Sequence, residues 1–170
     1  ILGVASSGGL SSEALAKNFK IKNKYQTEDE IFESDEIDAV FVLTQHFNHA
    51  ELVIRGINSG KAVYVEKPLA INVDSITKIE EAMYNAEDPK IFLGFNRRFS
   101  NASMFIKEKL NASPANALNF RFSVPKLERD HWTNIKEIGG GRVVGEAIHA
   151  IDLGTYFFDG IVGFFAPYSA

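Results

Sequence analysis

The sequence predicts an α/β fold in which a doubly wound parallel sheet is followed by a second domain. Two observations carry this prediction: apolar, β-branched runs recur along the chain, and segments with helical periodicity separate them. Strands joined by helices form parallel sheets with right-handed crossovers, and ligands bind outside the carboxyl ends of such strands. We therefore expect the functional residues directly after the apolar runs.

The predicted strands are short runs rich in Val, Ile and Phe. Residues 37–44 are nearly continuously apolar, which is typical of a strand covered on both faces of a parallel sheet. The other expected strands are residues 1–6, 61–65 and 90–95. Because residues 1–6 read as a strand with no turn or cap before it, we expect the chain to be an interior segment of a longer protein.

Helices are expected between these strands, at residues 12–19, 27–32, 48–58 and 74–84. Their ends carry recognisable signals. Thr27 and Glu30 form a capping-box pattern, and Asp74 is positioned to cap the last of the four helices. Ser59-Gly60 is suited to end the third helix.

The pattern changes in the last third of the chain. Residues 111–116 are a turn-rich break, and residues 117–124 alternate as an antiparallel strand would. A helical stretch, residues 143–158, follows later. We therefore expect two domains, at residues 1–110 and 111–170.

Composition excludes several classes of protein. The 18 Lys and Arg against 22 Asp and Glu give a net charge of −4, so no overall basic field favours nucleic acid or an anionic membrane. The chain has no cysteine, which excludes disulfides and thiolate chemistry and is compatible with a reducing cytosol. No apolar run reaches the roughly 18–20 residues that span a bilayer. We expect a cytoplasmic protein without nucleic-acid or membrane partners.

The first candidate site is a lysine at the carboxyl end of a predicted strand. Residues 62–65 run directly into Glu66-Lys67-Pro68. Pro68 restricts Lys67 to an extended or turn conformation, so the ammonium has a defined direction and can donate to a substrate hydroxyl. The alternative is a surface lysine with Glu66 as its solvated partner.

The second candidate follows the glycine run 139–141. Glu146, His149 and Asp152 recur at i, i+3 and i+6, so at least Glu146 and His149 share a helix face and form a tunable acid/base pair. One alternative is a packing histidine with ordinary surface carboxylates. Another is a divalent metal site of a hydrolase or lyase, although we expect no metal.

Further candidates lie at strand ends. His46 and His49 follow residues 37–44 and either line a cofactor site or cap a helix, while Ser6 and Ser7 offer amides and hydroxyls to a phosphate or ribose. No GxGxxG fingerprint precedes a helix in the chain. Taken alone, the residues therefore indicate an α/β ligand-binding enzyme fragment.

Three motifs in order resemble the Gfo/Idh/MocA family of NAD(P)-dependent oxidoreductases. They are Glu66-Lys67-Pro68-Leu69-Ala70, Gly94-Phe95-Asn96-Arg97-Arg98-Phe99, and the run Gly139-Gly140-Gly141 that leads to His149-Ala150-Ile151-Asp152-Leu153. The resemblance implies a Rossmann-type doubly wound sheet followed by the start of an α+β domain with an open, mainly antiparallel sheet. It also implies that the first Rossmann strand and its glycine loop precede this chain. Without them, this chain by itself would be inactive.

The resemblance implies hydride transfer between NAD or NADP and a secondary alcohol of a sugar, inositol or sugar nucleotide, in a homo-oligomer. Lys67 would hold the substrate hydroxyl, and His149 would be the acid/base, with Glu146 as a third catalytic residue. The expected cofactor-binding residues are Ser6, Ser7, Thr44, His46, His49, Glu66, Lys67 and Pro68. The expected substrate-binding residues are Lys67, Arg97, Trp132, His149 and Asp152.

The chain departs from the family pattern at two positions. Many members carry an aspartate four residues before the histidine, where this chain has Gly145, so either Glu146 substitutes for it or the chemistry depends on His149 alone. Ser6 stands where an acidic residue would hold an NAD ribose, which is compatible with NADP. A catalytically silent relative that binds sugar or cofactor, as a sensor or partner subunit, is the alternative function.

Overall fold

The computed structural model describes residues 1–6, 10–113, 117–121 and 126–160. In this part of the chain the strands form two parallel sheets. The smaller sheet pairs β1 (Gly3–Val4) with β2 (Asn23–Lys24), and the larger has the order β3 (Ala39–Val42), β4 (Ala62–Glu66), β5 (Ile91–Gly94). The predicted α/β class with parallel, Rossmann-like strands is confirmed.

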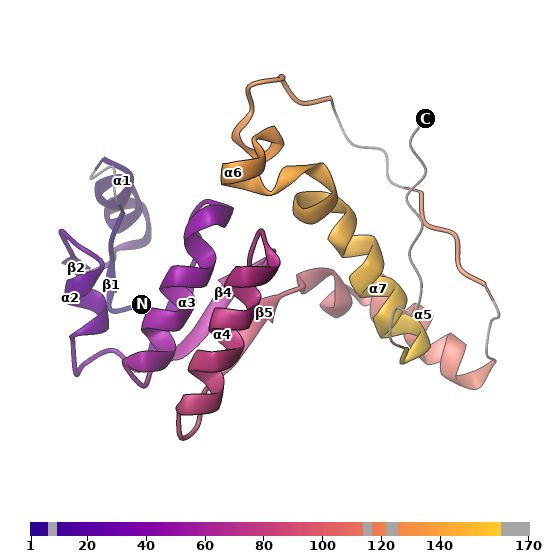
Figure 1. Cartoon of the computed structure of the whole chain (residues 1–170), viewed down its shortest axis with the longest axis horizontal. Helices are drawn as coiled ribbons and strands as arrows, with labels where there is room; N and C mark the ends of the chain where they lie inside the picture. Colours follow the sequence, from indigo (N-terminus) through magenta and orange to yellow (C-terminus); the bar gives the residue numbers. More distant parts are fainter. Residues whose placement is uncertain (7–9, 114–116, 122–125, 161–170) are drawn as a thin grey trace.

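Helices alternate with the strands (Figure 1), and the sequence predicts the first four of them but not the fifth, at residues 101–112. They are α1 (Leu10–Phe19), α2 (Asp29–Phe32), α3 (His49–Asn58), α4 (Val73–Asn85) and α5 (Asn101–Ala112). Two short 3-10 turns, η1 (His46–Asn48) and η2 (Asn96–Phe99), follow β3 and β5. Both turns therefore lie at the carboxyl edge of the larger sheet.

The helix ends confirm one capping prediction and correct another. Glu30 Oε1 accepts from the backbone N–H of Thr27 at 3.2 Å, and Thr27 Oγ1 accepts from the N–H of Glu30, so the capping box is formed. Asp74 does not cap α4. The cap is Asn72, whose side chain accepts from the N–H of Ser75 at 2.9 Å, because an N-cap side chain must stand before the first helical turn and Asp74 is already inside it.

The core lies between the larger sheet and two helices that cover one of its faces. Its most buried side chains are Val42, Val63 and Val65 from the strands, Leu52, Val53 and Ile57 from α3, and Ile79 from α4. Burial of such side chains contributes about 1.5–3 kcal/mol each. This packing fixes the positions of the carboxyl ends of β3 and β4.

The opposite face of the sheet is open in the described structure. Phe41 and Leu43 are 67% and 66% exposed, and the Phe41 ring stacks on Tyr64, which stacks on Phe92. The prediction that residues 37–44 are covered on both faces is therefore wrong. Successive crossovers of one hand that move in one direction place both helices, α3 and α4, on the same face.

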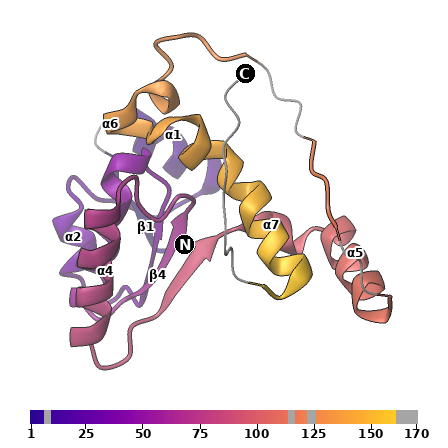
Figure 2. The same cartoon turned by 45° about the vertical axis from the view of Figure 1, so that its right-hand side comes forward.

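The C-terminal segment is helical, as predicted, but begins with an irregular turn. After η3 (Trp132–Asn134) and α6 (Lys136–Gly139), a π-helical turn, η4 (Val143–Ala147), leads into α7 (Ile148–Phe158). Figure 2 shows α7 running from the region of α6 toward α5, which it contacts.

The antiparallel strand expected at residues 117–124 is not formed where the structure describes it. Residues 117–121 belong to no strand, and residues 122–124 lie outside the described residues. Alternating polarity alone does not make a strand, because the backbone needs a hydrogen-bonding partner. The break expected at 111–116 starts late, since α5 continues to Ala112.

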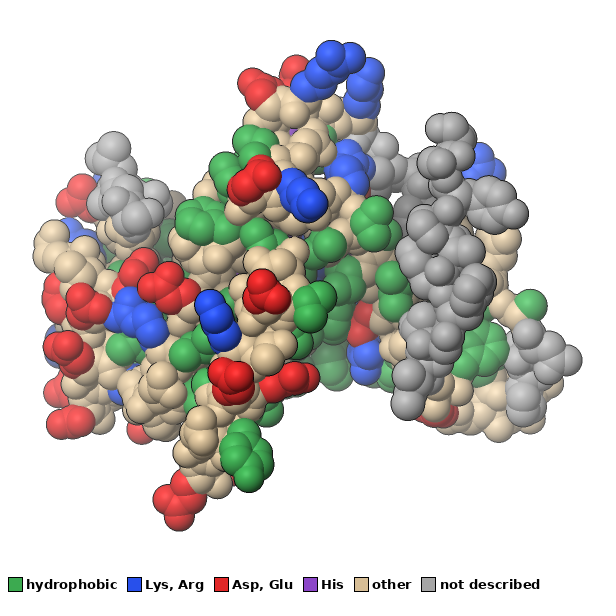
Figure 3. All heavy atoms as spheres, in the orientation of Figure 1, with side chains coloured by type: hydrophobic (Ala, Val, Ile, Leu, Met, Phe, Trp, Pro, Cys, Tyr) green, Lys and Arg blue, Asp and Glu red, His purple; other side chains and the backbone are tan. Residues whose placement is uncertain are grey.

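The described residues include no helix long and apolar enough to cross a membrane. On the face drawn in Figure 3, acidic and basic side chains are interspersed among the described residues. This face therefore presents no continuous basic surface.

Candidate active site

The candidate site lies where the turn after β4 meets the C-terminal helical segment. The ammonium of Lys67, one residue past β4, donates to the carbonyl oxygen of Gly145 at 2.6 Å. Gly145 is buried in the π-helical turn η4. The predicted lysine and the predicted glycine-run segment are thus brought into direct contact.

A glycine at position 145 fits this contact sterically. A Cβ atom on Gly145 would lie 3.4 Å from Cε1 of the buried His46 ring, at the lower limit of ordinary van der Waals contact, so the turn packs directly against this ring. π-helical turns are rare and occur frequently at functional sites. The turn thus lies against the His46 ring while the Gly145 carbonyl accepts from the lysine.

The electrostatic surroundings of Lys67 have opposing effects. Burial lowers the pKa of Lys67, whereas the carboxylates of Glu66 and Glu146 raise it and the Arg97 guanidinium lowers it. The net effect is a lowered pKa. Lys67 therefore releases its proton at a lower pH than an ordinary surface lysine does.

His149 lies in the first turn of α7 and is 8% exposed. Burial lowers its pKa, and the positive charges of Arg97 and Lys67 act in the same direction, while Asp152 and Glu66 oppose them. Its Nδ1 atom is the one buried side-chain nitrogen or oxygen in the described residues that has no hydrogen-bond partner. Nε2 is therefore the nitrogen left to contact a ligand.

Glu146 does not orient His149 as the helical spacing predicts. Its carboxylate accepts from Arg142 at 2.7 Å, while His149 Nδ1 has no partner. Arg142 stands four residues before Glu146, at the i,i+4 spacing of helical ion pairs, and binds its carboxylate. The charge of Glu146 acts on Lys67 instead. A catalytic role for Glu146 stays a prediction.

Asp152 forms an ion pair that the sequence does not reveal. Both of its carboxylate oxygens accept from Arg98, with Nε at 2.9 and 2.8 Å, and the carboxylate is 3% exposed. Arg98 belongs to the turn after β5, so the pair fixes α7 to the carboxyl edge of the sheet. The role of Asp152 in substrate binding stays a prediction, and Arg98 is the site residue that sequence reasoning missed.

The ion pairs Arg98–Asp152 and Arg142–Glu146 argue against the metal site of a hydrolase or lyase. Glu146 and Asp152 are each engaged by an arginine, and the described ranges contain no group of three His, Cys, Asp or Glu side chains placed to hold a metal ion. The arrangement does not favour a metal-dependent hydrolase or lyase.

The two predicted histidines after β3 are buried and bonded to backbone carbonyls. His49 Nδ1 lies 2.6 Å from the oxygen of Pro68 and Nε2 lies 3.1 Å from the oxygen of Thr44. His46 Nδ1 lies 2.8 Å from the oxygen of Gly139. Neither histidine is the N-cap of α3, which is Asn48, so the capping alternative is wrong. Their contact with a cofactor stays a prediction.

The remaining predicted residues surround this edge. Thr44 is exposed at the end of β3, and Arg97 is exposed in η2. Half-buried Glu66 accepts from the Tyr64 hydroxyl at 3.0 Å. Ser6 follows β1, whereas Ser7 lies outside the described residues. Pro68 is buried after a cis peptide bond, and half-buried Trp132 packs edge-on against His46 with ring centroids 4.7 Å apart.

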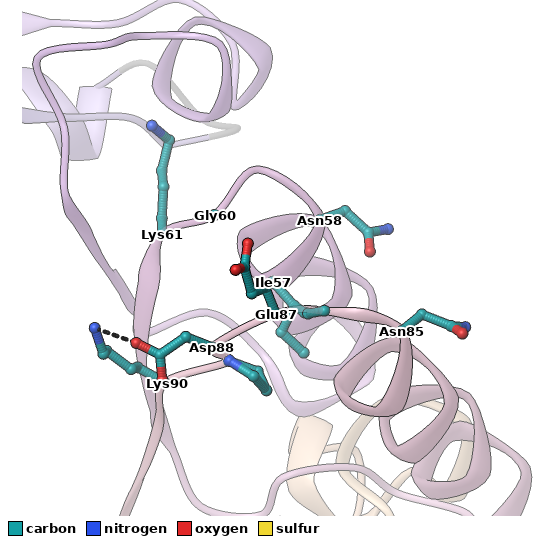
Figure 4. A pocket seen from close by; sticks show the side chains of 10 residues that line it. Ile57, Asn58, Gly60, Lys61, Asn85, Glu87, Asp88 and Lys90 are labelled. Atoms are coloured by element: carbon teal, nitrogen blue, oxygen red, sulfur yellow. Dashed lines mark ion pairs between the residues drawn. The ribbon is translucent and has the colours of Figure 1, made fainter.

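A hollow of about 440 Å³ lies away from this site (Figure 4). It is found where α3 and α4 end, and its lining includes Lys61 and the ion pair between Asp88 and Lys90. Lys61 precedes β4 and Lys67 follows it, so the hollow and the candidate site lie at opposite ends of the same strand. The hollow is therefore not part of the candidate site.

The chain is similar in sequence to known dehydrogenases. The chain is 27% identical over 136 residues to myo-inositol 2-dehydrogenase of Thermotoga maritima, covering 80% of the chain and 40% of that protein. It is 24% identical over 165 residues to trans-1,2-dihydrobenzene-1,2-diol dehydrogenase of Xenopus tropicalis, covering 94% and 49%. The chain thus spans less than half the length of these relatives.

Solved structures share the fold. Levoglucosan dehydrogenase in complex with NADH and levoglucosan aligns with a TM-score of 0.78 at 22% identity, covering 92% of this chain and 44% of that one. Myo-inositol dehydrogenase from Lactobacillus casei in complex with NAD(H) and myo-inositol gives 0.77 at 22% identity, covering 94% and 46%.

The family assignment rests on the N-terminal part of the chain. The sequence profile of the Gfo/Idh/MocA group, described as an oxidoreductase family with an NAD-binding Rossmann fold, matches residues 1–93 of the 170. This match covers more than half of the chain and includes all the parallel strands described above except the last residue of β5. The chain therefore belongs to the Gfo/Idh/MocA oxidoreductase family, as its motifs indicate.

Proposed function

We propose that the intact protein transfers a hydride between NAD(P) and a secondary alcohol of a sugar, an inositol or a sugar nucleotide. The observation that carries the proposal is the meeting of Lys67, from the carboxyl end of β4, with the segment of Gly145 and His149. Inositol and levoglucosan dehydrogenases among the relatives support a polyhydroxylated substrate.

The described residues fit a nicotinamide cofactor at the carboxyl edge of the sheets. Ser6 and Thr44 follow β1 and β3, and parallel sheets bind nucleotides outside these ends. Once bound, the nicotinamide supplies or accepts the hydride. We propose NAD(P), and titration of the intact protein with NADH and with NADPH measures which nucleotide binds more tightly.

His149 serves as the acid/base in this proposal. In the oxidative direction its neutral ring takes the hydroxyl proton at Nε2, and its lowered pKa keeps the ring neutral at physiological pH. The Lys67 ammonium donates to the same hydroxyl oxygen and stabilises the negative charge that develops there. In the reductive direction His149 returns the proton. Arg97, whose charge acts on both groups, is proposed to bind the substrate with Trp132.

The test is turnover by the intact protein. Reduction of NAD or NADP is followed by absorbance with myo-inositol, levoglucosan and glucose as substrates, and we expect saturable activity with at least one polyol or sugar. Absence of turnover across a broad panel of polyols, sugars and sugar nucleotides would contradict the proposal.

One observation favours a second candidate, a catalytically silent relative that binds sugar or cofactor. His149 has no hydrogen-bond partner at Nδ1, and Glu146 is paired with Arg142, so no carboxylate orients the proposed acid/base. Calorimetry separates the two candidates: a silent relative would bind NADH or a sugar without any turnover.

We also propose that residues 1–110 belong to the nucleotide-binding domain and that residues 111–170 begin a substrate domain, in a homo-oligomer. The ion pair of Arg98 with Asp152 and the Lys67–Gly145 contact would then join the two domains. Light scattering of the intact protein measures its oligomeric state.

A further inference from the structure

Two buried histidines, His46 and His49, lie next to the Lys67–Gly145 contact and one helical turn apart. His46 is 7% exposed and His49 is fully buried, and their ring centroids lie 5.5 Å apart. Both belong to the segment that leaves β3, His46 in η1 and His49 as the first residue of α3. Burying an imidazole is favourable only when its nitrogens find partners.

His49 connects the ends of two adjacent strands. Its Nδ1 is 2.6 Å from the carbonyl oxygen of Pro68, in the turn after β4, and its Nε2 is 3.1 Å from that of Thr44, after β3. Pro68 directly follows Lys67, so this ring is anchored one residue from the proposed lysine.

The two contact lengths favour Nδ1 as the donor nitrogen of His49. Carbonyl oxygens only accept hydrogen bonds, and a neutral imidazole has a single N–H. In the shorter contact the ring donates from Nδ1 to Pro68, and it donates from Nε2 to Thr44 as well only when it carries a second proton. The backbone of the lysine turn is thus held by a side chain from the neighbouring strand.

His46 acts on the other partner of the contact. Its Nδ1 donates to the carbonyl oxygen of Gly139 at 2.8 Å, at the end of α6, and its ring lies directly beneath Gly145. Packing of Trp132 against the ring fixes its orientation. The glycine run and the π-helical turn are thereby attached to the same segment that holds the lysine turn.

We infer that His46 and His49 are positioning residues, which donate from Nδ1 to Gly139 and Pro68 and thereby hold the Gly145 carbonyl and Lys67 against each other. This inference rests on the proposed function, because it gives the lysine the fixed direction that a hydroxyl donor needs. In this role the two histidines hold the backbone of the site in place and do not contact the nucleotide.

The connectivity of the side chains supplies a sharp set of variants. The amide nitrogen of Asn is as many bonds from Cα as the Nδ1 of His, and that of Gln is as many bonds from Cα as Nε2. His49→Asn therefore keeps a donor for Pro68, while His49→Gln moves it toward Thr44. His46→Asn and His46→Gln form the same pair at Gly139. His131→Gln is the control for loss of a histidine without a bond to the glycine run or the lysine turn, since that half-buried ring hydrogen-bonds Thr133 and stacks on Trp132.

The main readout is the titration of Lys67 in the intact protein, followed by competitive trace acetylation across pH with mass spectrometry. In the wild type and in His49→Asn we expect Lys67 to titrate below an ordinary lysine, because its ammonium stays half-buried at Gly145. In His49→Gln and His46→Gln the ammonium gains access to water, so its pKa rises toward about 10.4. The exposed Lys78 in the same digest is the internal reference.

Activity gives the second readout. Both Gln variants should lose about 10- to 100-fold in kcat with little change in nucleotide affinity, and the Asn variants should stay within about threefold of wild type. Unchanged Lys67 titration in folded Gln variants, or equal loss in the Asn and Gln variants, would overturn the inference. If the wild type itself shows no turnover, the proposed function fails, while the Lys67 titration still tests the positioning.

A measurement on the wild type covers the case in which the variants do not fold. Nitrogen-15 NMR of the imidazole rings reports which nitrogen is protonated, and we expect a proton on Nδ1 in both His46 and His49. A ring of either residue that carries its only proton on Nε2 would contradict the inference directly.

Discussion

Lys67 Nζ lies 2.6 Å from the carbonyl oxygen of Gly145, although 78 residues separate the two in the sequence. The contact joins the carboxyl end of a core strand to the turn that precedes His149. Any change that displaces the turn therefore also changes the direction of the lysine.

Replacement of Lys67 by Met should lower kcat/KM of the intact protein by roughly 100-fold or more, because a preorganised donor to developing charge is lost. Lys61→Met is the matched control at the other end of β4, where the ammonium donates to the backbone oxygens of Ser34 and Ile37. It should reduce the melting temperature and leave kcat/KM nearly unchanged. Steady-state kinetics measure kcat/KM of both variants. A kcat/KM of Lys67→Met within about threefold of wild type would show that the lysine has a structural role only.

His149 should set the acidic limb of the oxidative pH profile. Its lowered pKa means that the neutral, proton-accepting form persists to lower pH, so activity should rise with a midpoint below the ordinary value of about 6.5. His149→Asn should abolish the rising limb of the kcat/KM profile. A profile that keeps this limb in the variant would assign the base to another residue.

Glu146 should affect the alkaline limb instead. Its carboxylate raises the pKa of Lys67, so Glu146→Gln should let the ammonium lose its proton at lower pH and move the alkaline fall of activity downward. The acidic limb should stay in place. If the acidic limb disappears in this variant, Glu146 rather than His149 is the proton acceptor.

Folding stability should decrease in mild acid. Burial lowers the pKa of both His46 and His149 in the folded state, while both titrate near about 6.5 in the unfolded chain. Below that pH the unfolded state binds more protons, so the free energy of unfolding falls by at most about 1.4 kcal/mol per pH unit for each histidine. Urea unfolding between pH 8 and pH 5 measures this slope. The His46→Asn, His149→Asn double variant should show a smaller slope, and an identical one would contradict the assignment.

Asp152→Asn should destabilise the fold by about 2 kcal/mol, because it leaves the Arg98 guanidinium without its buried carboxylate. We expect less than the roughly 3–5 kcal/mol of a fully buried pair, since Arg98 is 35% exposed and can turn to water. Asp159→Asn is the control: this 79% exposed carboxylate pairs with Lys107, and its loss should cost under about 1 kcal/mol. Chemical denaturation of both variants gives the comparison, and equal losses would contradict this account.

Local patterns in the sequence predict most of the strands and helices and the sheet edge at which the site lies, although they do not indicate β2, α5 or α6. The apolar runs predict β3, β4 and β5, the polar and glycine signals predict the helices between them, and Lys67 is placed after a parallel strand by its position alone. These features depend on interactions within a few residues, such as the capping box of Thr27 and Glu30, so a local pattern contains them.

Which groups meet at that edge depends on packing between segments that are distant in the sequence. Asp152 pairs with Arg98 from 54 residues away, and His49 joins two strand ends through backbone carbonyls that no side-chain motif marks. The tertiary structure also left Phe41 and Leu43 exposed, where the apolar run predicts burial on both faces. Such contacts depend on how segments pack after they form, and the energies that select them are sums over many distant neighbours.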